Sequence, residues 1–230
     1  MFTGLVQAVG SIVSVRPLQS GVHIQIDAQA LAPRLIEPGD SIAVNGVCLT
    51  ATDVVGHRFG ADVSRETLSK TSGLDACRAV NLETSLALGD RLGGHLVSGH
   101  VDGVGRVLRV APVGESVELI VRAPAALARF LAPKGSVALD GVSLTINRLC
   151  DVGALLPAGK DRDAAVGAER GAGDGCEISI NLVPHTLAAT TLGGLAAGSQ
   201  VNLEVDLIAR YVARMLDCSA GKSDAEPEFP

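Results

Sequence analysis

Cys48 and Ser143, two side chains that can do nucleophilic chemistry, occupy the same position in a heptad that the chain contains twice. The first copy, residues 44–50, reads Val-Asn-Gly-Val-Cys-Leu-Thr, and the second, residues 139–145, reads Leu-Asp-Gly-Val-Ser-Leu-Thr. A cysteine is the softer nucleophile of the two when its pKa is lowered. The plainer alternative for Cys48 is a small buried residue without chemistry.

The repeat extends well beyond this heptad. The step of 95 residues that joins Cys48 to Ser143 also joins Val6 to Val101 and Asn45 to Asp140. Further along, the match continues at steps of 119 to 121 residues, where block 66–68 pairs with 185–187 and block 80–83 pairs with 201–204. A shared step over this length indicates an internal duplication and therefore two similar domains. The longer step means that the second half contains an insertion. We assign it to residues 153–175 and expect it to form a mobile surface loop.

The elements that must position these blocks are short strands. Segments rich in β-branched residues or with alternating polarity are bounded by Gly and Pro turns, which is typical of strands in small barrels. We expect strands at 5–15, 22–27, 41–52, 59–64 and 79–86, and again at 103–110, 116–122, 136–149, 177–182 and 200–205. Short helical stretches are expected at 31–36, 65–71 and 125–131. The sequence thus predicts an all-β fold of two tandem, similar six-stranded antiparallel β-barrels, followed by a C-terminal α-helix.

The predicted domains are 1–94 and 95–205, followed by a helix over 206–218 and a disordered tail over 219–230. Asp206 can cap the helix, and its apolar stripe is amphipathic; the stripe consists of Leu207, Ile208, Tyr211, Val212, Met215 and Leu216. Two alternatives remain open for this stripe. It packs on its own barrel, or it pairs with copies of itself.

Composition excludes several classes of protein. The net charge is −6 with no stripe of Lys and Arg, which argues against nucleic-acid binding. No apolar run is long enough for a membrane span, and the opening residues lack a signal-peptide pattern. The cysteines are five in number and lack CxxC spacing, so we expect reduced thiols in a cytoplasmic protein and no metal site.

Four motifs together resemble the riboflavin synthase family of the alpha-chain type. They are the opening Met-Phe-Thr-Gly, the paired Gly-Val-X-Leu-Thr blocks, Gly-Gly-His-Leu-Val-Ser-Gly-His at 93–100 and Asn-Leu-Val-Pro-His-Thr at 181–186. Each motif alone is a weak signal, but the set is specific and covers about residues 1–216.

The resemblance implies an activity and an assembly. Two molecules of 6,7-dimethyl-8-ribityllumazine would dismutate by transfer of a four-carbon unit, giving riboflavin and 5-amino-6-(ribitylamino)uracil, with no cofactor or metal. The C-terminal helix would hold a homotrimer. Each site would lie between the N-terminal barrel of one subunit and the C-terminal barrel of its neighbour, holding the two rings close together. A lumazine synthase is a possible further partner.

The resemblance also assigns roles to individual residues. His100 is the first choice for acid/base work, because an imidazole carries protons near neutral pH; the alternative is a structural histidine in a Gly-rich turn. We expect His95 in the same turn to be structural. Cys48 and Ser143 are expected beside the two bound rings, where either could add to an electrophilic ring carbon or direct water to it.

The expected ligand contacts come from the matched segments of both halves. The lone Lys134 is included, although such a lysine is usually just solvated. Glu66 and His185 are equivalent positions with different chemistry, which could distinguish donor from acceptor. The expected substrate-binding residues are Phe2, Gly4, Leu5, Val6, Leu49, Thr50, Asp62, Val63, Ser64, Arg65, Glu66, Thr67, Gly99, Val101, Lys134, Leu144, Thr145, Asn181, Leu182, Val183, Pro184, His185 and Thr186.

Two other functions compete with the enzyme. A non-catalytic lumazine or flavin carrier on the same fold would be expected to lose the motifs of one half, whereas both copies are intact here. An interaction protein, with the repeats as packing units only, does not explain the matching polar residues Thr50 and Thr145. The insertion at 153–175 either covers the pocket as a lid or loops into solvent.

Overall fold

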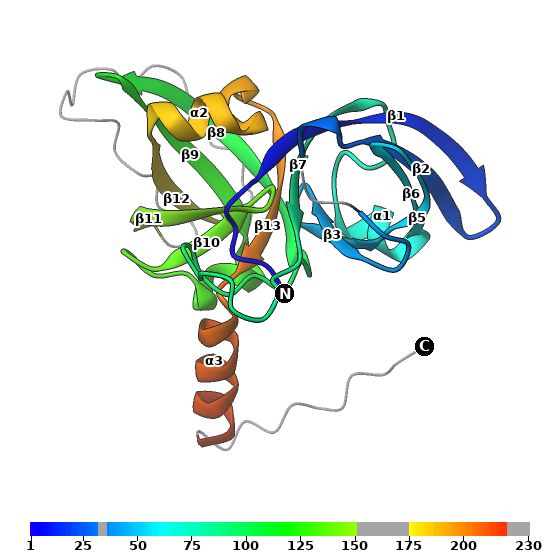
Figure 1. The fold of residues 1–230 in the computed structure, drawn as a ribbon. Helices are drawn as coiled ribbons and strands as arrows, with labels where there is room; N and C mark the ends of the chain where they lie inside the picture. Colours follow the sequence, from blue (N-terminus) through cyan, green and yellow to red (C-terminus); the bar gives the residue numbers. More distant parts are fainter. Residues whose placement is uncertain (32–35, 151–174, 220–230) are drawn as a thin grey trace.

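The computed structural model describes residues 1–31, 36–150 and 175–219, which form two curled antiparallel sheets and a projecting helix (Figure 1). The first sheet contains seven strands in the order β4-β3-β7-β1-β2-β6-β5. The strands are β1 (Ala8–Leu18), β2 (Gly21–Asp27), β3 (Ser41–Val44), β4 (Val47–Thr50), β5 (Thr52–Val55), β6 (Arg58–Ser64) and β7 (Arg78–Thr84).

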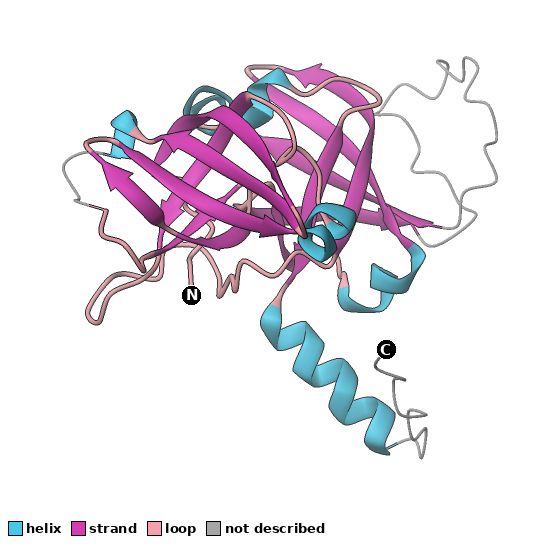
Figure 2. Ribbon diagram, turned by 90° about the vertical axis from the view of Figure 1, so that its right-hand side faces the viewer, coloured by secondary structure: helices cyan, strands magenta, loops and turns pink. Residues whose placement is uncertain are grey.

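The second sheet is a closed six-stranded barrel in the order β10-β11-β12-β9-β8-β13. Its strands are β8 (Gly103–Val113), β9 (Ser116–Pro124), β10 (Ser136–Leu139), β11 (Val142–Cys150), β12 (Gly175–Leu182) and β13 (Gln200–Val205). Figure 2 shows the two curled sheets lying against each other. The predicted fold class of two similar barrels with a C-terminal helix is confirmed.

The two barrels differ in one strand. The single strand β11 of the second barrel corresponds to β4 and β5 of the first, which are separated only by Ala51. The pairing of β5 with β6 is irregular between Thr52 and Val55, and Asp53 has a φ of 46°. A left-handed residue thus interrupts the regular ladder between β5 and β6. We did not predict β5 from the sequence.

Short helices connect the strands, and some differ from the sequence prediction. The helix expected at 65–71 is α1 (Arg65–Lys70), and the one expected at 125–131 is the 3-10 helix η2 (Ala125–Phe130). Of the segment expected at 31–36, residues 32–35 lie outside the described part, and η1 is Gln29–Leu31. Two helices were not predicted, α2 (Pro184–Ala189) and η3 (Thr191–Gly194). The expected loop at 153–175 and the tail at 219–230 lie outside the described residues, except Gly175 in β12 and Ser219 at the end of α3.

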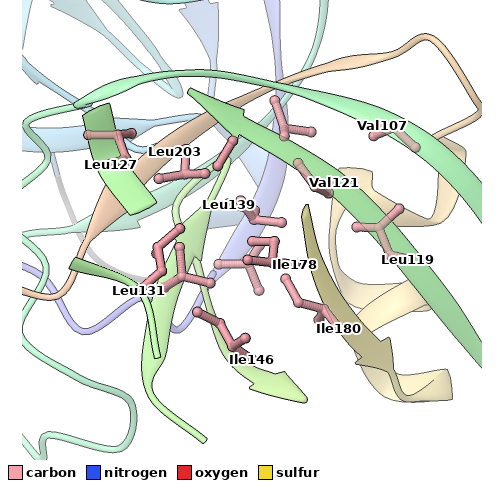
Figure 3. Close-up of a cluster of buried hydrophobic side chains, with 14 of the residues drawn as sticks. Val107, Leu119, Val121, Leu127, Leu131, Leu139, Ile146, Ile178, Ile180 and Leu203 are labelled. Atoms are coloured by element: carbon pink, nitrogen blue, oxygen red, sulfur yellow. The ribbon is translucent and has the colours of Figure 1, made fainter. Parts of the chain in front are cut away.

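Each barrel has its own aliphatic core. The core of the second barrel gathers inward-facing residues of neighbouring strands, among them Leu119 and Val121 of β9 and Ile178 and Ile180 of β12 (Figure 3). The alternation of these residues along their strands is the two-residue period that the sequence shows. The side chains of the two cores are Val, Leu, Ile and Ala with few aromatics, as the composition requires.

The C-terminal helix α3 (Leu207–Ser219) projects away from both barrels (Figure 1). Asp206 accepts a hydrogen bond from the backbone N–H of Ile208, as expected of a cap. Only Ala213 in this helix is buried, whereas its large apolar side chains are exposed, namely Ile208, Tyr211, Val212, Met215 and Leu216. The apolar stripe therefore does not pack on its own barrel. Among the described residues, no helix is long and apolar enough to span a membrane.

Candidate functional site

The segments that precede the two barrels are exchanged between them. Gly4 precedes β1 of the first barrel, yet its carbonyl accepts a hydrogen bond from the N–H of Ser143 in the second barrel, at 2.7 Å. Gly99 precedes β8 of the second barrel, and its carbonyl accepts from the N–H of Cys48 in the first, at 2.9 Å. In Figure 1 the N-terminal segment lies along the second barrel before it enters β1. Each candidate nucleophile therefore lies beside a segment that precedes the opposite barrel in the chain. We call these two segments, residues 4–6 and 99–101, the walls.

Close approach explains the glycines in these walls. Both have positive φ values, 74° for Gly4 and 80° for Gly99. A Cβ atom at Gly4 would lie 2.6 Å from the Cβ of Ser143, and one at Gly99 would lie 2.6 Å from the Cβ of Cys48. Only glycine combines this backbone conformation with this contact.

Two buried glutamates fix the exchanged walls. Glu83 accepts hydrogen bonds from the N–H and hydroxyl of Thr3 and from the N–H of Gly4. Its counterpart Glu204 accepts from the N–H and hydroxyl of Ser98 and from the N–H of Gly99. Burial raises the pKa of both carboxyl groups above the usual range, and the hydrogen bonds from the walls oppose this shift. The Val-Asn-Leu-Glu blocks of the repeat thus hold the two walls in place.

The wall segments also contact each other. Phe2 and Val97 form an antiparallel bridge through two backbone hydrogen bonds. The Phe2 side chain is completely buried and packs with Val97, Ala43 and Ala138. The structure therefore places Phe2 as a spacer between the two walls.

His95 and Ser143 form a pair that sequence reasoning did not find. The Nδ1 atom of His95 lies 2.7 Å from the Ser143 hydroxyl oxygen. The other ring nitrogen, Nε2, is buried and has no hydrogen-bond partner among the described residues. Burial lowers the pKa of His95, although the negative charge of Asp206 opposes this shift. A neutral imidazole beside a serine hydroxyl can accept its proton. The repeat gave no signal for this pair, because His95 lies outside the blocks that match between the two halves.

His100 lies elsewhere. It is exposed, and it directly follows Gly99, whose carbonyl binds the strand of Cys48. The next residue, Val101, packs against the core of the first barrel. The two histidines of the 93–100 motif therefore lie beside different barrels: His95 is beside the second, and His100 is beside the first.

The predicted site residues separate into two groups, one on each barrel. The group on the first barrel contains Cys48, Leu49, Thr50, the end of β6 with α1 (62–67), and the wall 99–101. The group on the second barrel contains Ser143, Leu144, Thr145, the end of β12 with α2 (181–186), and the wall 4–6. Val6 and Val101 pack against the core of the barrel opposite to their own strand. Lys134 belongs to the second group, since its N–H donates to the carbonyl of Ile146 in β11.

The loops after β6 and β12 are built alike. Ser64 caps α1 by accepting a hydrogen bond from the N–H of Thr67. Val183 stands at the corresponding cap of α2, where Pro184 at the first helical turn suits a helix start. Leu68 and Leu187 anchor the two helices to the first and second cores. Both loops therefore present polar groups of 62–67 and 181–186 at the edge of their barrels.

A groove of about 1170 Å³ lies between the barrels and away from both candidate nucleophiles. Residues from β7, β8, α2 and η3 line it, and Pro184 is the only predicted site residue among them. Cys48 and Ser143 do not line this groove. The matched residues therefore converge on the two walls and not on the groove. Among the described residues, no group of three or more His, Cys, Asp or Glu side chains could hold a metal ion.

The family follows from comparison with known proteins. The model of the lumazine binding domain matches residues 3–85 and again 98–206. Riboflavin synthase of Brucella abortus is 40% identical over 222 residues, which cover 94% of this chain and 98% of that protein.

This chain belongs to the riboflavin synthase family.

Further relatives agree with this membership. Riboflavin synthase of Photobacterium phosphoreum is 37% identical over 218 residues, covering 94% of this chain and 89% of that protein. The crystal structure of LumP complexed with riboflavin matches with a TM-score of 0.69 at 23% identity, covering 89% of this chain and 99% of the other. This second likeness shows the fold alone. The resemblance read from the sequence is confirmed, as is the prediction of a transferase of the riboflavin synthase type.

Proposed function

We propose that the chain converts two molecules of 6,7-dimethyl-8-ribityllumazine into riboflavin and 5-amino-6-(ribitylamino)uracil, with one ring held on each barrel. This proposal rests on one observation: each barrel contacts a wall segment that precedes the other barrel in the chain. Gly4 packs on Ser143 and Gly99 packs on Cys48, so both barrels keep an equivalent surface for a flat heterocycle. A dismutation of two identical molecules needs two similar sites, and proximity of the two rings lowers the barrier.

The two sites come together between copies of the chain in this proposal. Within one chain, Cys48 and Ser143 belong to different barrels, and in this proposal a second copy brings a first-barrel surface onto a second-barrel surface. The exposed stripe of α3 supplies a contact for assembly, because an apolar face of Ile208, Tyr211 and Met215 is unfavourable in water. We propose a homotrimer held by α3 in the cytoplasm, with domains at 1–94 and 95–205. Lumazine synthase remains a possible partner.

Individual residues take distinct roles. Ser143, hydrogen-bonded to neutral His95, is suited to proton transfer at the second site. Cys48 is the candidate nucleophile of the first site, and His100, exposed on the adjacent wall, is suited to acid/base work there. The ring edge and ribityl chain contact the loops 62–67 and 181–186, Thr50, Thr145 and Lys134.

The second candidate is a carrier that binds lumazine or a flavin without converting it. It is favoured by the fold shared with LumP, whose structures contain riboflavin or 6,7-dimethyl-8-(1'-D-ribityl) lumazine. The intact residues of both walls favour the enzyme instead.

Incubation of the purified chain with 6,7-dimethyl-8-ribityllumazine distinguishes the two functions. The enzyme produces one riboflavin for each pair of lumazine molecules consumed, which absorbance records without any added cofactor. Tight binding of the lumazine without loss of its absorbance would establish the carrier instead.

A further inference from the structure

The surroundings of the two sites carry opposite charge, although the sites derive from one repeated sequence. Three aligned pairs of site residues gain positive charge from the first half to the second, whereas Arg65, which aligns with Pro184, changes in the opposite direction. Asp62 corresponds to Asn181, Glu66 to His185, and Gly39 to Lys134. Each of these replacements makes the second site more positive than the first.

An ion-pair cluster on the first barrel is acidic. His23 on β2 lies between two carboxylates, with Nδ1 2.7 Å from Asp62 and Nε2 3.6 Å from Asp53. Both aspartate side chains are exposed, at 68% and 70%, whereas that of His23 is 13% exposed. Asp62 opens the loop 62–67 of the first site, so this cluster borders the site directly.

The matching cluster on the second barrel is basic. Glu118 is the counterpart of His23 and lies between two guanidinium groups. Arg109 donates to one of its oxygens at 2.6 Å and Arg148 to the other. Glu118 pairs across β9 and β12 with Asn181, where the loop 181–186 begins. This cluster therefore borders the second site as its counterpart borders the first.

Among the residues that the structure describes, other charged groups near the sites do not cancel the difference. Arg16 and Arg65 add positive charge to the first site, and Asp206 adds negative charge to the second. With histidines left aside, the first site has three carboxylates (Asp53, Asp62, Glu66) against two arginines. The second has three cations (Arg109, Lys134, Arg148) against two carboxylates. Glu83 and Glu204 are equivalent residues of the two sites, so they do not change the difference in charge. Asp102 does not change it either, because it forms an ion pair with Arg210.

The two sites also differ in how their histidines are placed. His95 is hydrogen-bonded to the hydroxyl of Ser143 at the second site. At the first site His100 is exposed, and among the described residues no hydrogen bond joins a histidine to Cys48. The second site combines a neutral base with a positive surrounding, whereas the first combines a thiol with a negative surrounding.

We propose that the lumazine on the second barrel is the one that loses its methyl proton, and that the lumazine on the first barrel is the neutral electrophile. This inference rests on the proposed function and assigns different roles to its two sites. The methyl C–H bond breaks, its electron pair spreads into the ring system, and the proton goes to the Ser143 oxygen. The Ser143 hydroxyl proton passes to Nδ1 of His95, so an anionic ring and an imidazolium form together. The excess positive charge of Arg109, Lys134 and Arg148 stabilises the anion.

Exchange of the methyl protons in D₂O measures this step separately from riboflavin formation. The full-length wild type and the variants Ser143→Ala, Arg148→Gln and Asp53→Asn are incubated with the lumazine, and loss of the methyl signal is followed by NMR across pH 6 to 9. Asp53→Asn is the matched control, since it removes one charge from the equivalent cluster of the first barrel. Thermal unfolding of each variant reports whether it is folded, and Arg109→Gln replaces Arg148→Gln if the latter is not.

Ser143→Ala is expected to slow exchange about tenfold or more. Arg148→Gln is expected to shift the pH midpoint of exchange upward by about 0.5 unit, because one positive charge near the ring is lost. Asp53→Asn is expected to leave the midpoint in place or lower it. A midpoint that rises with Asp53→Asn but not with Arg148→Gln, or exchange that survives Ser143→Ala, would overturn the assignment. Exchange without riboflavin formation in the wild type would refute the proposed function but leave this assignment standing.

Discussion

Asn81 and Asn202 occupy equivalent positions in the two barrels, and each side-chain amide bonds to the opposite barrel. The Nδ2 group of Asn81 donates to the carbonyl of Asp140 at 2.9 Å, and that of Asn202 donates to the carbonyl of Asn45 at 3.0 Å. Their Oδ1 atoms accept from the N–H groups of Thr191 and Ser72. The two barrels are therefore joined by a nearly symmetric set of buried hydrogen bonds.

Replacement of Asn202 by Ala should destabilise the chain strongly. The change removes the acceptor of Ser72 N–H and the donors to the carbonyls of Asn45 and Ser72, and leaves these groups unpaired between the barrels. We expect a loss of about 2–4 kcal/mol in the free energy of unfolding, since buried unsatisfied groups are costly. Urea unfolding measures the loss, and the exposed Asn147→Ala serves as control, with an expected change below about 0.5 kcal/mol. Equal effects of the two substitutions would contradict the role of the buried amide.

Asp140 makes this contact sensitive to pH. It stands where the first barrel has Asn45, and burial raises its pKa to about 7 from the usual 3.8. The folded chain thus holds a proton that the unfolded chain releases between these values. The associated stability is complete below about pH 4 and is lost as the pH rises through about 7.

Asp140→Asn should therefore stabilise the chain at pH 8, by as much as about 4 kcal/mol. An amide oxygen can still accept the hydrogen bond from Asn202 N–H, as Asn45 accepts from Asn81. The reverse change, Asn45→Asp, should introduce a second pH-dependent loss of stability at the equivalent position. Unfolding curves between pH 4 and 8 test both, and identical pH profiles of wild type and Asp140→Asn would rule this explanation out.

A side chain at the glycine of either wall should lower turnover. We expect Gly99→Ala to lower turnover by about a hundredfold, because a Cβ atom there forces the wall away from Cys48 and a displacement of about 1 Å is enough for such a loss. Gly114→Ala is the control. It has a similar positive φ of 63° but no atom within 4 Å of the added Cβ, so it tests backbone strain alone. If steady-state assays gave both variants the same activity, the close approach would not matter.

The helix α3 should determine assembly. Tyr211→Lys together with Met215→Lys places charges on the exposed apolar stripe and should convert the proposed trimer into monomers with little turnover. Val55→Lys, an equally drastic change on the first barrel where the side chain is 76% exposed, should leave the mass unchanged. Light scattering after size-exclusion chromatography reads the masses. An unchanged mass in the helix variant would exclude α3 as the contact.

Much of the fold was predictable from the repeat. The shared step fixed two similar barrels, and the period of the last segment predicted α3. The exchange of the walls was not predictable, because Gly4 and Gly99 precede the strands of one barrel and their carbonyls bond to the other. A linear repeat shows which residues are equivalent but not which barrel they contact.

Within the site, the equivalence of Cys48 and Ser143 was visible in the sequence, whereas the contact of His95 with Ser143 was not. Two histidines lie five residues apart in the same Gly-rich segment, and sequence reasoning favoured His100. The N–H of His95 donates to the carbonyl of Thr3 in the N-terminal segment, and its side chain reaches Ser143. Only this long-range contact distinguishes the two imidazoles.

In the proposed assembly, each site combines a first barrel and a second barrel from different copies of the chain. Thr50→Arg blocks the first barrel and Thr145→Arg the second; both positions are exposed, so both variants should fold. Each variant alone should be nearly inactive. Refolding them together in equal amounts should restore about one quarter of the wild-type activity. In the mixture half of the first barrels and half of the second barrels are intact, so about one quarter of random contacts between copies join two intact barrels. A mixture as inactive as its two components would place the complete site within one chain and contradict the account.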